Sequence, residues 1–371
     1  MEVSTELKDN DEIAPSSGMS KEVLPLGDPV RLLVAVDSKL IRRLIRDIFE
    51  GSDQVQIVGE ASNGTEVLEM LPHLNPDVII LDVDLPVMDG LTVLKYIMIK
   101  YPKPTVMLSA YTKEVEYVTF ETLKYGAVDL IDIPSRFQRM TLSEQRQRVI
   151  PKVLTAAKMR VEAVQNLDPV PKQAQPKRLG ERNCDFLFAM GASIGGYNAL
   201  LKIIPQIRYD LPAAFLVVLY AASEHLDAFV KYLDEESAIK VKRAVDGDLL
   251  ESGVCYMATG DDYVTVHSSN GQLSLETHSN LIPSPKGPTN MLMFSLAEVM
   301  KYRSIGIILS GSGVDGVEGI EEILRTGGIG IVQDPLSCLC QETARAALNR
   351  CKIDLVLSDW KIPSEINNLL I

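Results

Sequence analysis

One short segment of the sequence combines a candidate nucleophile with the glycines needed to expose it. Residues 191–195 read Gly-Ala-Ser-Ile-Gly and lie between an apolar segment and a segment of helical character. A serine on such a turn is raised above the end of a strand, and the start of the following helix favours developing negative charge. The pattern therefore indicates that Ser193 is a nucleophile for acyl transfer. Phosphate-binding loops and tight strand–helix turns use the same residue types and remain alternatives.

A second set of reactive side chains follows short apolar runs in the first half of the chain. Asp37, Asp82 and Ser109 each come at the end of such a run, and Ile133-Pro134 follows the next one. In an open parallel sheet, the carboxyl ends of the strands meet at one edge, where ligands bind. We therefore expect these side chains to lie close together at a sheet edge.

Two series of alternating strands and helices are required to position these residues. Short apolar runs alternate with amphipathic stretches from Arg31 onward, and a second alternation begins at Asp185. This alternation is typical of βαβ units with a parallel sheet. Helical spacing is clear at 38–50, where Ser38 is placed to cap the helix. We predict two doubly wound α/β domains, a long helix at 144–164 and a β-rich passage at 254–275.

Polar segments mark the boundaries of these domains. Residues 1–28 are acidic and polar, and they bury too little apolar surface to fold, so we predict a flexible tail. Residues 166–183 include three prolines and lack an apolar period, which is typical of an extended linker. The two predicted domains are then 29–165 and 184–371.

The composition restricts the partners and the compartment. A net charge of -13 over 371 residues disfavours binding to nucleic acid or to anionic lipid, because both attract positive charge. The longest apolar stretch, 211–222, contains Pro212 and is shorter than the ~18 residues of a membrane span. The acidic N-terminus is not of the signal-peptide type. We expect a protein with no membrane span, and protein or small-molecule partners.

The cysteines indicate a reducing environment. The chain has five of them, an odd number that is too small for a disulfide scaffold. Cys338 and Cys340 lack the second pair that a metal site of this kind needs, so we interpret them as buried apolar thiols. A cytoplasmic location is expected.

The first domain resembles the receiver domain of two-component response regulators. The resemblance covers 31 to about 140 and is carried by VIILDVDLPVMDGLTVL at 78–94, VMLSA at 106–110 and GAVDLIDIP at 126–134. It implies a flavodoxin-like fold in which Asp82 accepts a phosphoryl group and Ser109 is the switch hydroxyl. It also implies a Mg²⁺ site, for which Asp37, Asp82 and Asp84 are the candidate ligands. Asp84 and Asp89 are alternatively interpreted as turn formers.

Two charged residues of the receiver pattern are missing. Val36 stands where a second acidic residue is expected, and Ile133 stands where a lysine is expected before proline. Asp132 has the wrong sign to replace that lysine. Asp82 is therefore either a true phosphoacceptor or a retained strand-end aspartate with weak or no phosphorylation.

The second domain is similar to the catalytic domain of the chemotaxis protein-glutamate methylesterases, the CheB family. The residues that carry this resemblance are the serine motif, 246–266 and 308–337, and the arrangement of receiver, linker and catalytic domain is that of the family. The resemblance implies hydrolysis of glutamate methyl esters on chemoreceptors and deamidation of certain glutamines by Ser, His and Asp. Ser193 corresponds to the nucleophile and Asp315 to the acid. The implied partners are the chemoreceptor cytoplasmic region and a chemotaxis histidine kinase, and the receiver is expected to cover the serine site.

The histidine of this family pattern is absent. Tyr220 stands at its position, and a phenol with a reference pKa of about 10 is a poor base near neutrality. His225 is interpreted either as a substitute base or as a polar residue near a helix start. Asp315 alternatively caps a helix that starts near Val317.

Other positions also depart from the family pattern. Ser312 replaces a methionine, Tyr263 replaces a histidine, and Thr289-Asn290 replaces a Val-Asp pair. The remaining histidines, His73, His267 and His278, are assigned to unrelated segments with no catalytic role.

Three functions are weighed from these residues. Loss of the base of a serine triad lowers kcat by about 10⁶. We therefore favour a CheB-like response regulator that keeps its contact surfaces but has weak or no hydrolysis. The alternative is an active receptor methylesterase that uses His225 or another base and is regulated by phosphorylation of Asp82. A general hydrolase of small esters would leave the receiver-like half unexplained.

Overall fold

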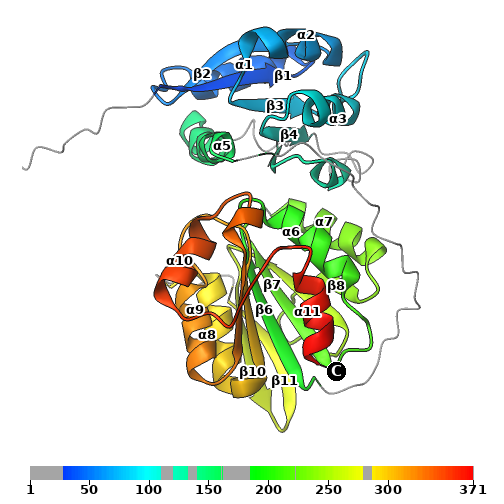
Figure 1. The fold of residues 1–371 in the computed structure, drawn as a ribbon, viewed down its shortest axis with the longest axis vertical. Coiled ribbons are helices and arrows are strands. Elements are labelled where there is room, and N and C mark those ends of the chain that lie inside the picture. The colour runs from blue at the N-terminus through cyan, green and yellow to red at the C-terminus, as the bar shows by residue number, and fades with distance from the viewer. Residues whose placement is uncertain are drawn as a thin grey trace, which may run out of the picture.

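The computed structural model describes residues 28–109, 120–132, 140–159, 161, 184–221, 223–278 and 286–370. Only Asp28 of the predicted tail at 1–28 belongs to these residues, and the predicted linker at 166–183 lies outside them. Ile133 and Pro134 also lie outside them. Figure 1 shows the two α/β units that the described residues form. After the resemblances of their sequences, we call them the receiver unit and the esterase unit.

The receiver unit is built on a five-stranded parallel sheet with the order β2-β1-β3-β4-β5. Its strands are β1 (Val30–Ala35), β2 (Val55–Ala61), β3 (Val78–Asp82), β4 (Thr105–Ser109) and β5 (Asp129–Asp132). The central strand β3 is apolar on both faces, and the residues from Val78 to Leu81 are 0% exposed, as burial between two helix layers requires. This strand order is the flavodoxin-like one, so the predicted fold class is confirmed.

Helices cover both faces of this sheet. They are α1 (Lys39–Phe49), α2 (Gly64–Leu74), α3 (Gly90–Lys100) and α5 (Leu142–Ala157), together with the helical residues 120–124. Side chains of α1 and α5 pack with Leu32 and Val34 of β1, whereas those of α2 and α3 pack with Leu33 and Ala35. Alternate residues of one strand therefore serve opposite faces, as the strand period of two requires.

The helix α5 is shorter than the predicted helix at 144–164. It begins at Leu142 because Thr141 and Glu144 form a capping box, in which each side chain accepts the backbone N–H of the other residue. At the other end, the N–H groups of Lys158 and Met159 donate to carbonyls three residues back, which tightens the last turn. Residues 158, 159 and 161 are not helical.

The esterase unit has a seven-stranded parallel sheet with the order β14-β13-β12-β6-β7-β9-β8. Its strands are β6 (Phe186–Ala192), β7 (Ala213–Leu219), β8 (Lys240–Arg243), β9 (Val254–Thr259), β12 (Ser304–Ile308), β13 (Ile329–Gln333) and β14 (Leu355–Leu357). The β-rich passage predicted at 254–275 forms β9 and an antiparallel hairpin of β10 (Tyr263–Ser269) and β11 (Gln272–His278). The prediction of a second doubly wound α/β domain is confirmed.

The helices of the esterase unit also form two layers. One layer contains α6 (Gly196–Ile203), α7 (Ser223–Glu236) and α11 (Ile362–Leu369), and the other contains α8 (Pro288–Met300), α9 (Val317–Arg325) and α10 (Glu342–Arg350). Short 3₁₀ turns lie at 204–206, 301–303 and 335–337. The β10–β11 hairpin packs its apolar side on the layer of α8. None of the described helices has the length and apolar character that crossing a membrane requires.

Both sheets place the residues of interest where the winding of the chain reverses. In the receiver unit the reversal lies between β1 and β3, which lead to Asp37 and end at Asp82. In the esterase unit it lies between β6 and β12, which are followed by Ser193 and by the loop that carries Asp315. Such switch points are where open α/β sheets bind their ligands. The topology alone therefore brings each candidate set together.

An aromatic cluster joins the two units. Phe120 of the receiver unit packs against three rings of the esterase unit, with centroid distances of 6.1 Å to Tyr197, 5.2 Å to Phe229 and 5.7 Å to Tyr232. Phe120 is 2% exposed, and one continuous apolar cluster extends through both units. These four rings are called the aromatic cluster below.

Polar and apolar contacts extend this junction. The Asn198 side-chain amide of α6 donates to the carbonyls of Leu123 and Ala127 at 3.0 and 2.9 Å. On the other side of the receiver sheet, Leu339 and Cys340 of the esterase unit pack in the apolar cluster that contains the buried side of α5. The receiver unit is therefore held against the esterase unit from two sides.

Candidate active site and receiver site

Ser193 is the first residue after β6, on the turn into α6. Its N–H donates to the Ser310 carbonyl at 3.1 Å, and its own carbonyl accepts the Gly196 N–H at 2.8 Å. Gly195 has a φ of +77°, a conformation that favours glycine, and a Cβ there would lie 2.6 Å from Ser310 Oγ. The predicted exposed turn is thus produced by the glycine and by the loop that follows β12.

The Ser193 hydroxyl lies against that loop. Its Oγ accepts the Ser312 N–H at 2.8 Å, so a backbone donor and not a side chain fixes its position. Gly311 leaves the room for it, because a Cβ there would lie 2.5 Å from Ser193 Oγ. Among the described residues, no imidazole nitrogen is hydrogen-bonded to this hydroxyl. In the part of the chain that the structure describes, the recorded partner of this hydroxyl is a backbone N–H.

The Asp315 carboxylate is bound by the start of α8. Its Oδ2 accepts the Thr289 N–H at 2.8 Å, and its Oδ1 accepts the Asn290 N–H at 2.9 Å. The hypothesis that Asp315 caps the helix near Val317 is therefore wrong, because α9 has Gly316 as its N-cap and no side-chain cap. Asp315 instead satisfies free N–H groups of α8, whose own N-cap, Gly287, offers no side chain.

Tyr220 is the first residue after β7, and its hydroxyl donates to Asp315 Oδ2 at 2.7 Å. The ring lies over Gly260, where a Cβ would be 2.4 Å from the Tyr220 Cδ1. Partial burial, and then the negative charge of Asp315, raise the pKa of Tyr220 above its ordinary value. The phenol is therefore a donor held by the carboxylate, and it keeps its proton at neutral pH.

A cavity of about 330 Å³ connects these side chains, and both units line it. Ser193, Tyr220 and Asp315 lie on the esterase side, and Asp129 and Lys152 lie on the receiver side. The structure thus brings together the three esterase residues that the sequence singled out. It also places the receiver unit beside them.

Lys152 is a residue of this cavity that the sequence analysis missed. Its ammonium group donates to Asp129 Oδ2 at 3.0 Å and to the Leu130 carbonyl at 2.7 Å. Nothing in the sequence marks it, since it is one of several charged residues on the polar side of an amphipathic helix. Only the docking of α5 near the serine turn gives it a place in the site.

His225 lies on α7 and lines a neighbouring cavity of about 250 Å³. Tyr220 lines both cavities, whereas Ser193 lines the cavity of about 330 Å³ and His225 the cavity of about 250 Å³. The described contacts of Ser193 Oγ do not include His225. A role of His225 as base stays a prediction.

The receiver site gathers carboxylates at the ends of β1 and β3. Burial, and then the charges of Asp84 and Asp37, raise the pKa of Asp82 to about 6. Asp82 Oδ1 also accepts the Asp84 N–H at 3.1 Å. Val36 is 0% exposed, and its carbonyl accepts a guanidinium N–H of Arg42. The position of the missing acidic residue is therefore apolar, and a cation of α1 lies on its backbone.

The donor set that remains fits a Mg²⁺ ion in its chemistry. Asp37, Asp82 and Asp84 supply carboxylate oxygens, which this hard cation prefers. Burial is the main cause of the raised pKa of Asp82, and the charges of Asp84 and Asp37 add to it; a divalent cation would offset both effects. Ser109 ends β4 and pairs in register with Asp132 of β5, and the side chains of both lie outside the described residues.

Two of the alternative assignments concern residues around these sites. Asp89 caps α3, since its Oδ1 accepts the Thr92 N–H at 2.9 Å, which agrees with the turn-forming interpretation. Cys338 and Cys340 are free and buried, and burial raises the pKa of both thiols. Both cysteines have the surroundings expected of apolar thiols.

Comparison with known proteins assigns a family to both units. Residues 32–144 match the model of the response regulator receiver domain, and residues 188–366 match that of the CheB methylesterase. The chain is 34% identical to the protein-glutamate methylesterase/protein-glutamine glutaminase of Pyrococcus horikoshii, over 92% of this chain and 94% of that one. It is 35% identical to protein-glutamate methylesterase/protein-glutamine glutaminase 2 of Methanosarcina acetivorans, over 92% and 99%.

Solved structures include a similar one for the esterase unit. The Thermotoga maritima CheB methylesterase catalytic domain is 27% identical, with a TM-score of 0.48. The match covers 50% of this chain and 98% of the Thermotoga chain. The family matches in both halves and the full-length relatives agree with the order of the two units along the chain. The chain belongs to the CheB family of chemotaxis response regulators, which join a receiver domain to a methylesterase domain.

Proposed function

We propose that this protein acts in chemotaxis signalling as a CheB-type regulator that binds its partners but hydrolyses glutamate methyl esters weakly or not at all. The observation that carries this proposal is the 2.7 Å hydrogen bond from the Tyr220 hydroxyl to Asp315. In a serine triad, the acid orients an imidazole, and the imidazole takes the serine proton. Here the acid holds a phenol that cannot take it at neutral pH.

The expected loss of activity is large. Removal of the base from a serine triad lowers kcat by about 10⁶ and leaves roughly 10³ to 10⁴ over water from binding and the oxyanion site. Ser193 still stands on its glycine turn, and the Ser312 N–H donates to its hydroxyl. A protein that keeps this fold but lacks the catalytic base is suited to binding its partners more than to hydrolysing methyl esters.

The partners proposed from the family are the cytoplasmic region of a chemoreceptor and a chemotaxis histidine kinase, and a cytoplasmic location is proposed with them. The proposal that the receiver covers the serine site is supported by the cavity of Ser193, since Asp129 and Lys152 of the receiver unit line it. A receptor segment bound at Ser193 would therefore lie beside these side chains.

The test is methanol release from methylated receptor by the full chain. We expect the wild type and Ser193→Ala to be equally slow. Tyr220→His restores an imidazole beside Asp315 and is expected to raise the rate by about 10² or more, within the range of general base catalysis. Tyr220→Phe is the matched control, because it changes the same position without adding a base.

A wild-type rate comparable to that of a relative with the histidine, and abolished in Ser193→Ala, would contradict the proposal. If His225→Gln then removed that rate, the alternative of an active esterase with His225 as base would be correct. A rate that survives His225→Gln would require a different base.

We also propose that Asp82 is a weak phosphoacceptor. Asp37, Asp82 and Asp84 would hold Mg²⁺, which neutralises charge on a transferring phosphoryl group. The lysine that would assist is replaced by Ile133, so slow and incomplete phosphorylation is expected. Incubation with acetyl phosphate and Mg²⁺, followed by mass measurement, should detect a phosphoryl group in the wild type and none in Asp82→Asn. Equal labelling of both proteins would show that Asp82 is not the acceptor.

A further inference from the structure

The β10–β11 hairpin brings together residues to which no role at the serine site is assigned. Its register pairs Thr265 with Glu276, and His267 with Ser274. Because side chains alternate between the two faces of a strand, His267, Glu276 and His278 share one face. The opposite face, with Val266 and Leu275, is buried in the core of the esterase unit. His267 and His278 lie on paired strands, a neighbourhood that the sequence interpretation did not include.

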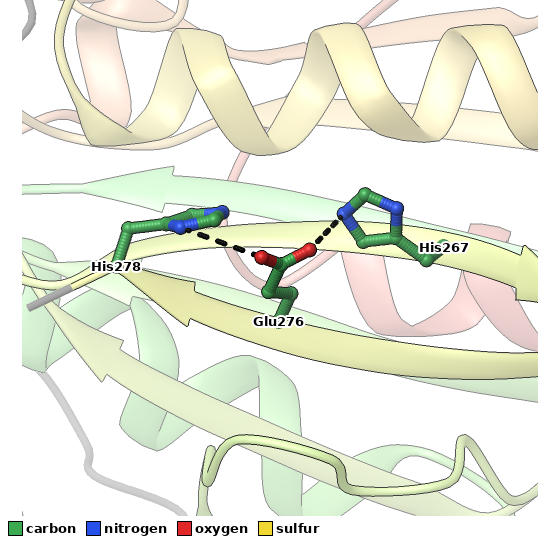
Figure 2. Close-up of side chains that lie close together, drawn as sticks. All are labelled: His267, Glu276 and His278. Carbon is green, nitrogen blue, oxygen red and sulfur yellow. Dashed lines mark ion pairs between the residues drawn. The ribbon is translucent and has the colours of Figure 1, made fainter.

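The three side chains converge on one another, as Figure 2 shows. His267 Nε2 lies 2.9 Å from Glu276 Oε2, and His278 Nδ1 lies 3.8 Å from Glu276 Oε1. Both oxygens of one carboxylate thus face an imidazole each. One ligand atom from each residue can be chosen so that all three lie within 4.8 Å of one another.

A buried hydroxyl supports this arrangement from below. Thr265 is 7% exposed, and its Oγ1 lies 3.1 Å from His267 Nε2 and 3.2 Å from His278 Nε2. A single hydroxyl has only one proton to donate, so it cannot donate to both rings at once. The hydroxyl and the carboxylate together draw both imidazoles toward one point on the hairpin surface.

We propose that His267, Glu276 and His278 bind a divalent transition-metal ion, with Zn²⁺ as the best fit, and that water completes the coordination. Two imidazoles and one carboxylate form a donor set that suits Zn²⁺ and disfavours Mg²⁺ and Ca²⁺, which prefer oxygen ligands. Without a metal ion, the two imidazoles have only hydrogen bonds or ion pairs with Glu276 to gain. A cation between them gains three ligand bonds and is also attracted by the net charge of -13.

The geometry needs only side-chain movement. Zinc–nitrogen and zinc–oxygen bonds of about 2.0–2.2 Å in a tetrahedron place ligand atoms about 3.4 Å apart. The present separations of the ligand atoms are up to 4.8 Å. Rotation of the side chains on a fixed hairpin shortens them to the spacing that the tetrahedron requires. The side chains of His267 and Glu276 are 53% and 50% exposed, so they have room to rotate.

None of the three proposed ligands lines the cavity of Ser193, although Tyr263, which pairs with His278, acts electrostatically on Tyr220. Figure 1 shows the hairpin at the end of the esterase unit that is remote from the receiver unit. A metal ion there links β10 to β11 across their exposed face. The expected effect is a clip on the hairpin that raises the stability of the folded chain without a direct part in catalysis.

The test is zinc binding by the full chain after removal of metal with a chelator. A chromophoric competitor is titrated against Zn²⁺ in the presence of excess Mg²⁺, which is added to compete for the carboxylates of the receiver site. We expect one tight site in the wild type. His267→Gln and Glu276→Gln should weaken it by about 100-fold or more, since loss of a supporting residue alone costs 10- to 100-fold. His73→Gln, at an exposed histidine of α2, is the matched control and should bind as the wild type does.

Cobalt identifies the ligands independently. Co²⁺ in this site should show visible d–d bands and no thiolate-to-metal charge-transfer band, which excludes the cysteines as ligands. Thr265→Val keeps the strand shape and removes the hydroxyl, so it should weaken zinc binding by about 10-fold. The proposal is overturned if the wild type lacks a tight site, if His267→Gln and Glu276→Gln bind zinc as tightly as His73→Gln, or if a thiolate band appears.

Discussion

At the scale of the residue, the proton of Tyr220 decides the chemistry of the serine site. Partial burial and the Asp315 carboxylate both disfavour the phenolate, so the pKa of Tyr220 lies above its reference of about 10. A group with a raised pKa stays protonated over the whole range below that pKa. Raising the pH from 7 toward 10 therefore does not convert this phenol into a phenolate base.

This leads to a prediction for the pH dependence of esterase activity. We expect the wild-type rate of methanol release to show no phenol-type rise between pH 7 and pH 10. In Tyr220→His the rate should instead rise with the loss of a proton from an imidazole, whose reference pKa is about 6.5. The measurement is the initial rate across this pH range, corrected for spontaneous ester hydrolysis. A wild-type rate that rises tenfold per pH unit below pH 9 and disappears in Tyr220→Phe would contradict it.

The sequence predicted which residues meet at the serine site but not all of their contacts. Ser193 was recognisable because its glycine turn is a local feature, whereas Asp315 was assigned by the resemblance to the CheB family. The partner of Asp315 was not recognisable, since the N–H groups of Thr289 and Asn290 lie 26 and 25 positions away along the chain. A capping role across two elements leaves no periodic signal in the sequence.

At the scale of the element, α8 depends on a residue outside it. Its N-cap is Gly287, and Pro288 supplies no N–H, so the first N–H groups of the helix turn to the carboxylate of Asp315. Gly287 itself has a φ of +77°, and a Cβ there would lie 2.3 Å from Asp315 Oδ1. The start of α8 is built around this side chain.

We therefore predict that Asp315→Ala lowers the free energy of unfolding by about 2 kcal/mol, from the loss of a helix cap and of charge-assisted hydrogen bonds. Asp315→Asn keeps one acceptor oxygen and should lose less. Urea unfolding followed by circular dichroism measures both, and Ser312→Ala is the control, since its backbone N–H is unchanged. Equal stability of Asp315→Ala and the wild type would mean that water replaces the carboxylate at no cost.

The boundaries of elements were predicted less well than their type. The motif at 191–195 was expected to follow the apolar segment, whereas β6, which runs from Phe186 to Ala192, includes the first two residues of the motif. The strand continues because Gly191 and Ala192 pair with β7, although neither residue type favours strands. The Asn270-Gly271 turn, with φ values of +53° and +81°, is a hairpin signal that could have revealed the pairing of β10 with β11.

At the scale of the whole molecule, the two units are joined by a core and not by a surface contact alone. The aromatic cluster and the Asn198 amide hold the receiver unit on α6 and α7. Sequence periodicity could not show this, because Phe120 and Tyr197 are apolar positions like many others on amphipathic helices. Which apolar face meets which is decided by shape, and a single sequence does not display shape.

Breaking this junction is predicted to loosen the receiver unit. Phe120→Ala removes a buried ring, which costs about 3–5 kcal/mol, and Asn198→Ala removes two hydrogen bonds. Hydrogen exchange of the amides in 120–132 and 142–157 should become faster in both variants. Lys202→Ala, which breaks only an ion pair with Asp359 inside the esterase unit, is the control. Unchanged exchange in Phe120→Ala would show that the units do not depend on each other.

The rings of the aromatic cluster come from both halves of the chain, and this restricts how the sequence can vary. One ring comes from the first half of the gene and three come from the second, so neither half carries a complete set. A chimera that takes one half from another organism would expose mismatched rings to water unless all four were exchanged together. Single substitutions at these four positions should therefore destabilise the protein more than matched combinations do. The two halves of the chain are then expected to vary together at these positions.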